Sequence, residues 1–230
     1  MSTSAQPRVT LKLATSLDGK IALSNGQSKW ITGPESRAEV HRMRAAHDAI
    51  LTGVGTILAD DPEFTARTDP MPEKQPDLIV LDSKLRTPVT SRILQPFGRS
   101  VRVYHCEAAP PSKDPAFYER KARLQDAGAV VIDGGFYDSR PDLEWVLEHL
   151  ANSYGQLMVE AGQGVTGRFV EWDLADRLVW FRAPKILGKR AIDALDVWPG
   201  LESLDLAPIF HRISVTERGD DLQETYERIR

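Results

Sequence analysis

The chain has 230 residues, 41% of them hydrophobic and 27% charged, which is the composition of a globular protein that can bury a substantial core. Its 33 acidic residues outnumber its 29 Lys and Arg, so the net charge gives no sign of binding to nucleic acid or to an anionic membrane. Cys106 is the only cysteine, which excludes an internal disulfide and a cysteine-rich metal site. Because the N-terminus is polar and no long apolar run occurs, we expect a cytoplasmic protein.

The first part of the chain alternates between strand and helix patterns. Apolar residues at every second position predict a strand over 9–15. A proline at the first helical position, followed by apolar residues at helical spacing, predicts a helix over 34–46. A compact apolar strand at 48–52 then meets the glycine turn 53–56, which starts a short helix ending near 60–62.

The later elements are predicted in the same way, from apolar runs, glycine stops and turn residues. They are a loop at 66–75, strands at 77–81, 100–105, 129–132, 156–160 and 177–183, helices at 115–127 and 141–152, and a short helix that follows the glycine-rich segment 161–167 and runs to Trp172. Residues 209–230 alternate weakly around Gly219 and predict an antiparallel hairpin. The repeated strand–helix–strand order predicts a single α/β domain over residues 1–230, with a mostly parallel sheet flanked by helices.

Two glycine-rich segments stand between a strand and a helix, where backbone N–H groups and the helix dipole attract phosphate. The first, Gly53-Val54-Gly55-Thr56, is explained equally well as a tight turn. The second, residues 162–167, matches the pattern G-x-G-x-x-G and favours anion or dinucleotide binding. The next strand leads into Arg182-Ala-Pro-Lys185 and not into an acidic residue, so an ordinary Rossmann NAD site is not supported.

The strand at 77–81 leads into a polar turn that suits a dinucleotide. Asp82 is a candidate for a ribose hydroxyl, whereas Ser83, Lys84 and Arg86 suit a 2′-phosphate. The two cations favour NADP over NAD, although a solvated basic turn explains the same residues nearly as well.

Ser28, Trp30 and Thr32 would share one face if their segment were extended. An indole with flanking hydroxyls suits a planar pyrimidine or nicotinamide ring, although a tryptophan is more often a core anchor.

Charged residues elsewhere suit the two ends of a phosphorylated ligand. Arg44 and Arg67 would bind a terminal phosphate if they converge with Lys12, although such arginines usually pair with acids. Glu160 ends an apolar strand, where a carboxylate can accept hydrogen bonds from ring N–H groups. The five histidines lack the spacing of a metal site, so we expect no metal.

Seven segments, read in order, resemble the reductase domain of the bifunctional riboflavin-biosynthesis deaminase/reductases. They are Val9-Thr-Leu-Lys-Leu-Ala-Thr-Ser-Leu-Asp-Gly-Lys20, Ser28-Lys-Trp-Ile-Thr32, His41-Arg-Met-Arg44, Asp48-Ala-Ile-Leu-Thr-Gly-Val-Gly-Thr56, Leu58-Ala-Asp-Asp-Pro62, Leu157-Met-Val-Glu-Ala-Gly162 and Ala183-Pro-Lys-Ile-Leu-Gly188. Their order and spacing match across nearly the whole chain, which is far more specific than one glycine loop.

The resemblance implies a dihydrofolate-reductase-like α/β fold, a homodimer, and NADPH-dependent reduction of 5-amino-6-(5-phosphoribosylamino)uracil to the ribitylamino phosphate. The substrate contacts it implies are Lys12, Ser28, Arg44, Phe64, Arg67 and Glu160. The NADPH contacts it implies are Ala14, Trp30, Thr56, Asp60, Ser83, Gly162, Gln163, Gly164, Val165, Thr166, Gly167 and Arg168.

One departure from the bifunctional enzymes matters. They carry an N-terminal zinc deaminase with H-x-E and P-C-x-x-C signatures, and this sequence has neither. We therefore expect either that another protein carries out the deamination or that this reductase accepts the undeaminated pyrimidine. Two other functions stay open at this point: a pterin or folate reductase, and a non-catalytic NADPH-binding paralogue.

Overall fold

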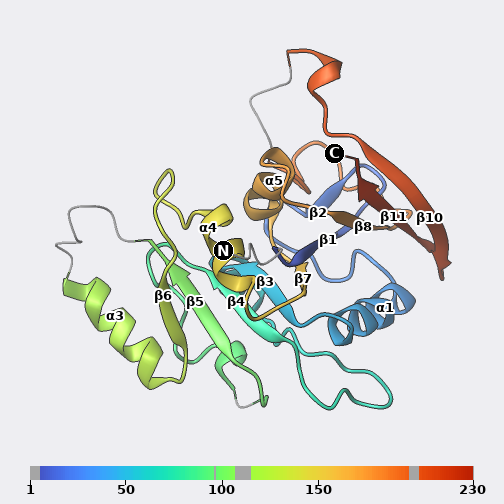
Figure 1. Ribbon diagram of the computed structural model, residues 1–230. Coiled ribbons are helices and arrows are strands. Elements are labelled where there is room, and N and C mark those ends of the chain that lie inside the picture. Colours follow the sequence, from blue (N-terminus) through green and yellow to red (C-terminus); the bar gives the residue numbers. More distant parts are fainter. Residues whose placement is uncertain (1–5, 96, 107–114, 197–201, 230) are drawn as a thin grey trace. The chain divides into compact units, whose positions relative to one another are not determined.

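The computed structural model describes residues 6–95, 97–106, 115–196 and 202–229, and they form two compact units (Figure 1). The first unit contains residues 44–157 together with the start of the chain, and the second contains residues 8–43 and 158–230. Strand β7, Gln156–Val159, carries the chain from the first unit into the second. The organisation as a single reductase domain stays a prediction.

The first unit is built on four neighbouring parallel strands, which lie side by side in Figure 1. In sheet order they are β3 Ala49–Gly53, β4 Asp77–Leu81, β5 Val101–His105 and β6 Val130–Asp133. The helices are α2 Val54–Asp60, α3 Pro115–Asp126 and α4 Leu143–Leu150, with a 3₁₀ turn at Arg92–Leu94. All residues of β3 and β4 are buried, as expected for strands covered on both faces.

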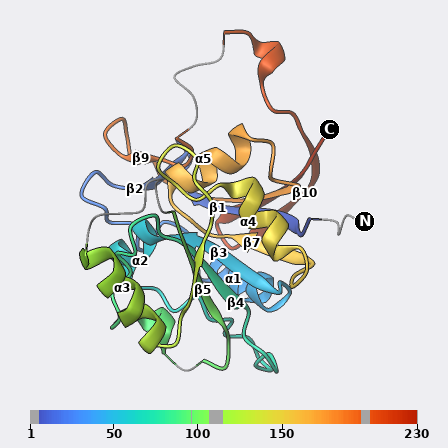
Figure 2. The same ribbon diagram turned by 60° about the vertical axis from the view of Figure 1, so that its left-hand side comes forward.

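The helices of this unit cover opposite faces of β5, because successive side chains of a strand alternate between faces. His105 packs edge-to-face against Phe117 of α3, whereas Tyr104 packs against Trp145 and His149 of α4. Ile57 of α2 joins the same core cluster as Phe117, so α2 and α3 share a face. Figure 2 shows α2 and α3 on one side of these strands and α4 on the other.

The second unit has β1 Arg8–Thr15 parallel to β8 Arg177–Arg182, followed by the antiparallel hairpin of β11 Asp221–Arg228 and β10 Phe210–Arg218. Its remaining elements are α1 Pro34–Ala45, α5 Gln163–Glu171, the short pair β2 Lys20–Ala22 and β9 Ile192–Asp193, and a 3₁₀ turn at Leu204–Leu206. Val40 of α1 packs against Met158, Val179 and Phe181, so α1 covers one face of these strands.

The predicted α/β fold is confirmed, with its parallel strands, flanking helices and C-terminal hairpin. The turn of that hairpin holds Gly219 at φ +64, in the left-handed region that glycine adopts without strain. The helix predicted at 141–152 begins at Leu143, because the Asp142 carboxylate accepts hydrogen bonds from the Glu144 and Trp145 N–H groups and caps it. Strands β2 and β9 were not predicted, since two or three residues are too few for a periodic pattern.

Across the described residues, no helix is long and apolar enough to cross a membrane. The same residues contain no group of three or more His, Cys, Asp or Glu side chains that could hold a metal ion.

Candidate active-site residues

In the first unit, three of the predicted substrate contacts gather around one short segment, residues 63–67. Arg44 donates a hydrogen bond to the Thr65 carbonyl at 3.1 Å, and its guanidinium lies 5.5 Å from the centre of the Phe64 ring. Arg67 pairs with Glu63 at 2.9 Å and keeps 57% of its side chain exposed. Arg44 and Arg67 therefore both contact residues 63–67 within this unit, and their convergence with Lys12 stays a prediction.

Glu63 is the carboxylate within this segment. It pairs with Arg92 as well as with Arg67. Burial alone would raise the pKa of Glu63, but the charge of Arg92 and the Thr65 hydroxyl outweigh burial and hold the pKa below its ordinary value. Glu63 thus stays ionised and neutralises only part of the local positive charge.

Arg99, which the sequence analysis did not single out, holds the same segment from inside. Its guanidinium donates to the Phe64 carbonyl at 3.0 Å and to the Glu63 carbonyl. Phe64 has φ +53, a left-handed conformation that a non-glycine residue adopts only when its surroundings hold it there. Burial, and then the charge of Arg44, lower the pKa of Arg99 to about 10, so Arg99 is still a cation at neutral pH.

The predicted cofactor contacts of the first unit lie beyond the carboxyl ends of β3 and β4. These strands are parallel neighbours, so their ends share one edge of the sheet. Thr56 lies on α2 and Asp60 ends that helix, whereas Ser83 follows β4. A side chain built at Gly55 would meet nothing within 4 Å, so the backbone there is open to a close approach.

Asp82 has a structural task in this turn. It is fully buried, and one carboxylate oxygen accepts the Thr87 N–H at 2.7 Å and the Thr87 hydroxyl at 2.8 Å. Asp82 therefore stabilises the turn that carries Ser83 and Lys84. These hydrogen bonds within the protein do not support the predicted contact of Asp82 with a ribose hydroxyl.

In the second unit, Lys12 of β1 pairs with Glu160, which directly follows β7. The distance between Nζ and Oε2 is 3.5 Å, and both side chains are largely buried. Ala14 lies two residues beyond Lys12 and so faces the same side of β1. This pair brings together two predicted substrate contacts that are 148 residues apart in the sequence.

The segment that carries Ser28 and Trp30 is a turn, not an extended strand. The Ile31 N–H donates to the Ser28 carbonyl at 3.3 Å, so the shared face that an extended segment would give to Ser28, Trp30 and Thr32 does not form. Trp30 is 65% exposed, which excludes the core-anchor interpretation.

Two cations fix the Trp30 turn in place. Lys185, just beyond β8, donates to the Trp30 and Ile31 carbonyls at 2.7 and 2.8 Å. The guanidinium of Arg37 lies 4.2 Å from the centre of the Trp30 ring and also donates to the Thr32 carbonyl. One face of the indole is therefore covered by a cation, and the ring is held as an exposed plate.

The glycine run before and within α5 divides into an open half and a packed half. A side chain at Gly162 or Gly164 would meet nothing within 4 Å, which suits the close approach of a ligand to the backbone. At Gly167 a Cβ would lie 2.3 Å from the Asp196 carbonyl oxygen, so this glycine is required for packing. Thr166 and Arg168 are also buried, and the Thr166 hydroxyl donates to the Ala194 carbonyl at 2.9 Å.

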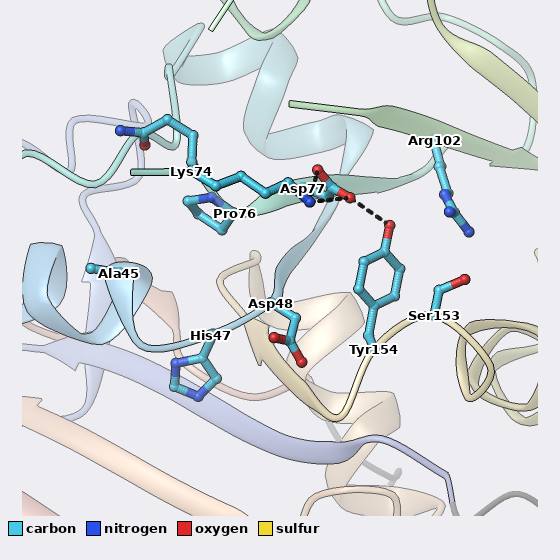
Figure 3. Close-up of a pocket in the computed structure, with 10 residues that line it drawn as sticks. Ala45, His47, Asp48, Lys74, Pro76, Asp77, Arg102, Ser153 and Tyr154 are labelled. Carbon is cyan, nitrogen blue, oxygen red and sulfur yellow. Dashed lines mark hydrogen bonds and ion pairs between the residues drawn. The ribbon is translucent and has the colours of Figure 1, made fainter. Parts of the chain in front are cut away.

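A separate pocket of about 330 Å³ lies at the opposite edge of the first unit, where β3, β4 and β5 begin (Figure 3). Its carboxylates are used structurally: Asp48 accepts the Gly155 and Gln156 N–H groups, and Asp77 accepts the Tyr154 hydroxyl at 3.0 Å. Burial, and then the charge of Asp77, raise the pKa of Tyr154, which therefore stays a neutral donor. None of the predicted site residues lines this pocket.

Comparison with known proteins identifies the family of the chain. A family model described as the RibD C-terminal domain matches residues 7–206. The riboflavin biosynthesis protein RibD of Aquifex aeolicus is 35% identical over 98% of this chain and 59% of its own length. The 2,5-diamino-6-ribosylamino-4(3H)-pyrimidinone 5′-phosphate reductase of Methanothermobacter thermautotrophicus is 36% identical over 86% of this chain and 88% of its own length.

A solved structure of RibD from Acinetobacter baumannii superposes with a TM-score of 0.81 at 27% identity, covering 98% of this chain and 59% of that one. The chain thus spans a little under three fifths of the RibD proteins that it matches.

Proposed function

Because the chain belongs to the RibD C-terminal domain family, we propose that it reduces 5-amino-6-(5-phosphoribosylamino)uracil, or the undeaminated diaminopyrimidinone, to the ribitylamino phosphate with NADPH. The observation that carries this proposal is the gathering of Arg44, Phe64 and Arg67 around residues 63–67. The similarity to the archaeal reductase, which covers most of both chains, supports the undeaminated compound as one of the two substrates to test.

We assign the phosphate end of the substrate to Arg44 and Arg67. A guanidinium offers paired donors that match phosphate oxygens, and its hydrogen bonds to an ionised group are stronger than neutral ones. Arg67 is exposed and able to exchange Glu63 for a phosphate oxygen, whereas Arg44 is held by the Thr65 carbonyl. The ring of Phe64 is buried in the core of this unit, so Phe64 would contribute its backbone to the site.

We assign the pyrimidine end to Glu160 and Ser28. A carboxylate accepts hydrogen bonds from ring N–H groups, and Lys12 lies beside it at 3.5 Å. Lys12 also provides a donor for a ring carbonyl. A pterin shares the amino–oxo pyrimidine edge of the undeaminated compound, so rejection of a pterin would come from the phosphate contacts and not from the ring.

The residues that would hold NADPH fit a dinucleotide. The open backbone at Gly162 and Gly164 suits the pyrophosphate, and the exposed plate of Trp30 suits the nicotinamide ring. Ser83, with Lys84 and Arg86 beside it, suits the 2′-phosphate that distinguishes NADPH from NADH. The further contacts proposed for the cofactor are Ala14, Thr56, Asp60, Gln163 and Val165, whereas the predicted contacts Thr166, Gly167 and Arg168 are used in packing.

The chemistry assigned to the protein is positioning. The ribosylamine opens to an imine, its C1′ gains a hydride, and the adjacent nitrogen gains a proton, so the ribityl amine forms. The bound cofactor supplies the hydride. The side chains assigned here would fix the phosphate and the ring, so that C1′ is presented at reacting distance and water is excluded.

We also propose that the protein is a cytoplasmic homodimer. Strand β10 supports the dimer, because Ile213 and Val215 are about half exposed and β10 pairs with β11 alone among the described strands. An edge strand offers unpaired backbone N–H and C=O groups to a second chain, and its exposed apolar side chains would add to such a contact. If β10 forms the interface, Ile213→Lys should shift the sedimentation coefficient from that of a dimer to that of a monomer.

The decisive experiment mixes the purified chain with NADPH and either pyrimidine phosphate, and follows the cofactor absorbance. Oxidation that requires one of these two compounds supports the proposal. Oxidation with dihydrofolate and not with either compound would select a folate-type reductase. NADPH binding without any oxidation would select a non-catalytic paralogue.

A further inference from the structure

The hydrogen bonds of Arg99 do not explain why this position carries a positive charge. Arg99 is a partly buried cation whose hydrogen bonds go to two backbone carbonyls, those of Glu63 and Phe64. Burying a charge is costly, and a neutral side chain could donate to a carbonyl equally well. Its Nε is buried without a hydrogen-bond partner among the described residues, which adds to the cost.

The two carbonyls belong to the segment that carries the proposed phosphate contacts. Holding them fixes the backbone on both sides of Phe64, whose left-handed φ of +53 needs outside support. Arg44 binds the next carbonyl along, that of Thr65, at 3.1 Å. Arg99 and Arg44 therefore grip three consecutive carbonyls, and Arg67 follows two residues later.

The positive charge of Arg99 also acts on this segment. Arg44 is close enough to lower the pKa of Arg99, so the two guanidinium groups repel each other, and the carboxylates of Asp77 and Glu63 offset part of that repulsion. An anion bound beside Arg44 and Arg67 would relieve that repulsion. A dianionic phosphate is the ligand that gains most from such a surplus of positive charge.

We infer that Arg99 is a positioning residue for the phosphate end of the substrate: it holds the Glu63 and Phe64 carbonyls so that Arg44, Phe64 and Arg67 are pre-arranged around one anion. The inference rests on the proposed function for the identity of the substrate, although the anion site itself does not depend on turnover. Pre-arrangement raises affinity because less ordering is needed on binding.

The test compares Arg99→Met with Arg99→Lys and with Arg102→Met as the matched control. Arg102 lies three residues further along the chain, on β5, and its guanidinium lies 5.1 Å from the centre of the Tyr154 ring. Arg99→Met should raise the KM for the pyrimidine phosphate about tenfold, with kcat and the KM for NADPH unchanged, since two charge-assisted hydrogen bonds are lost. Arg99→Lys keeps the charge but not the paired donors of the guanidinium, so its KM for the pyrimidine phosphate should lie between the values of Arg99→Met and the wild type. The KM of Arg102→Met should equal that of the wild type.

A second readout separates failure of this inference from failure of the proposed function. Affinity for ribose 5-phosphate, measured by calorimetry, needs no turnover, and Arg99→Met should weaken it about tenfold as well. If the wild type binds ribose 5-phosphate but reduces neither pyrimidine, the proposed function falls and this comparison still decides the role of Arg99. An Arg99→Met variant with wild-type KM and wild-type affinity for ribose 5-phosphate would overturn the inference. A lower kcat with unchanged KM and unchanged affinity would mean that less of the Arg99→Met protein is correctly folded. That result would also overturn the inference, because Arg99 would then serve folding alone.

Discussion

Lys12 and Glu160 form an ion pair in the second unit, with 3.5 Å between Nζ and Oε2 and only 16% and 8% of the two side chains exposed. The pair joins β1 to the residue that follows β7. Because the two side chains form this ion pair, they should act together on a bound pyrimidine, and removing one should change both stability and binding.

Lys12→Met removes the cation and keeps a chain of similar length. We expect the free energy of unfolding to fall by about 1–3 kcal/mol, because a largely buried carboxylate loses a charged partner. The KM for the pyrimidine should rise, because the donor that Lys12 would offer to a ring carbonyl is lost. Urea denaturation and initial rates measure the two effects. Lys20→Met, which breaks a pair with the exposed Asp193, is the control and should cost under about 1 kcal/mol. Equal effects of the two substitutions would contradict this role of Lys12.

Arg67→Ala tests the phosphate end. A charge-assisted hydrogen bond is worth roughly 1.5–3 kcal/mol, so the KM for the substrate should rise about tenfold to a hundredfold. Stability should hardly change, because the ion pair of Arg67 with Glu63 is exposed on the arginine side. Arg42→Ala removes a similarly exposed arginine from its pair with Glu39 on α1 and should leave the KM unaltered. An unchanged KM for Arg67→Ala would remove Arg67 from the site.

Regular periodic patterns predicted most of the fold, because they are local. The strand predicted at 9–15 is β1, and the weak alternation around Gly219 is the C-terminal hairpin. The turn at Trp30 escaped the same reasoning, since its shape depends on Lys185, which lies 155 residues away. Arg99 was missed for the same reason: its partners, Glu63 and Phe64, precede it by 36 and 35 residues, and no motif joins them.

The glycine run at α5 allows a test that separates packing from ligand approach. Gly167→Ala should strongly destabilise the protein, because the new Cβ would lie 2.3 Å from the Asp196 carbonyl oxygen. Gly164→Ala meets nothing within 4 Å, and in the first turn of α5 it should raise stability by up to about 0.5–1 kcal/mol, because alanine loses less backbone entropy than glycine. Its KM for NADPH should nevertheless rise, since the methyl group would block the pyrophosphate. Thermal melts and cofactor titrations measure both, and an unchanged KM for NADPH would exclude a close approach at Gly164.

Cofactor preference should depend on the turn that Asp82 shapes. Replacing both exposed cations, Lys84→Ala and Arg86→Ala, should lower kcat/KM for NADPH about tenfold or more and leave the value for NADH unchanged. Lys121→Ala on α3 is the control for a general loss of surface charge. If the double variant keeps the wild-type ratio of kcat/KM for NADPH to kcat/KM for NADH, the 2′-phosphate is bound elsewhere.

Asp18 should give the second unit a measurable acid sensitivity. Hydrogen bonds from the Ser16 hydroxyl and then from the Leu187 N–H lower the pKa of Asp18 from 3.8 to about 2. The folded state therefore binds this proton less readily than the unfolded state, so the stabilisation is complete above pH 3.8 and is lost as the pH falls through about 2. Asp18→Asn should melt at a lower temperature than the wild type at neutral pH, and the difference should shrink between pH 4 and pH 2. A difference that stays constant down to pH 2 would mean that the carboxylate charge contributes nothing, and that the side chain acts through its shape alone.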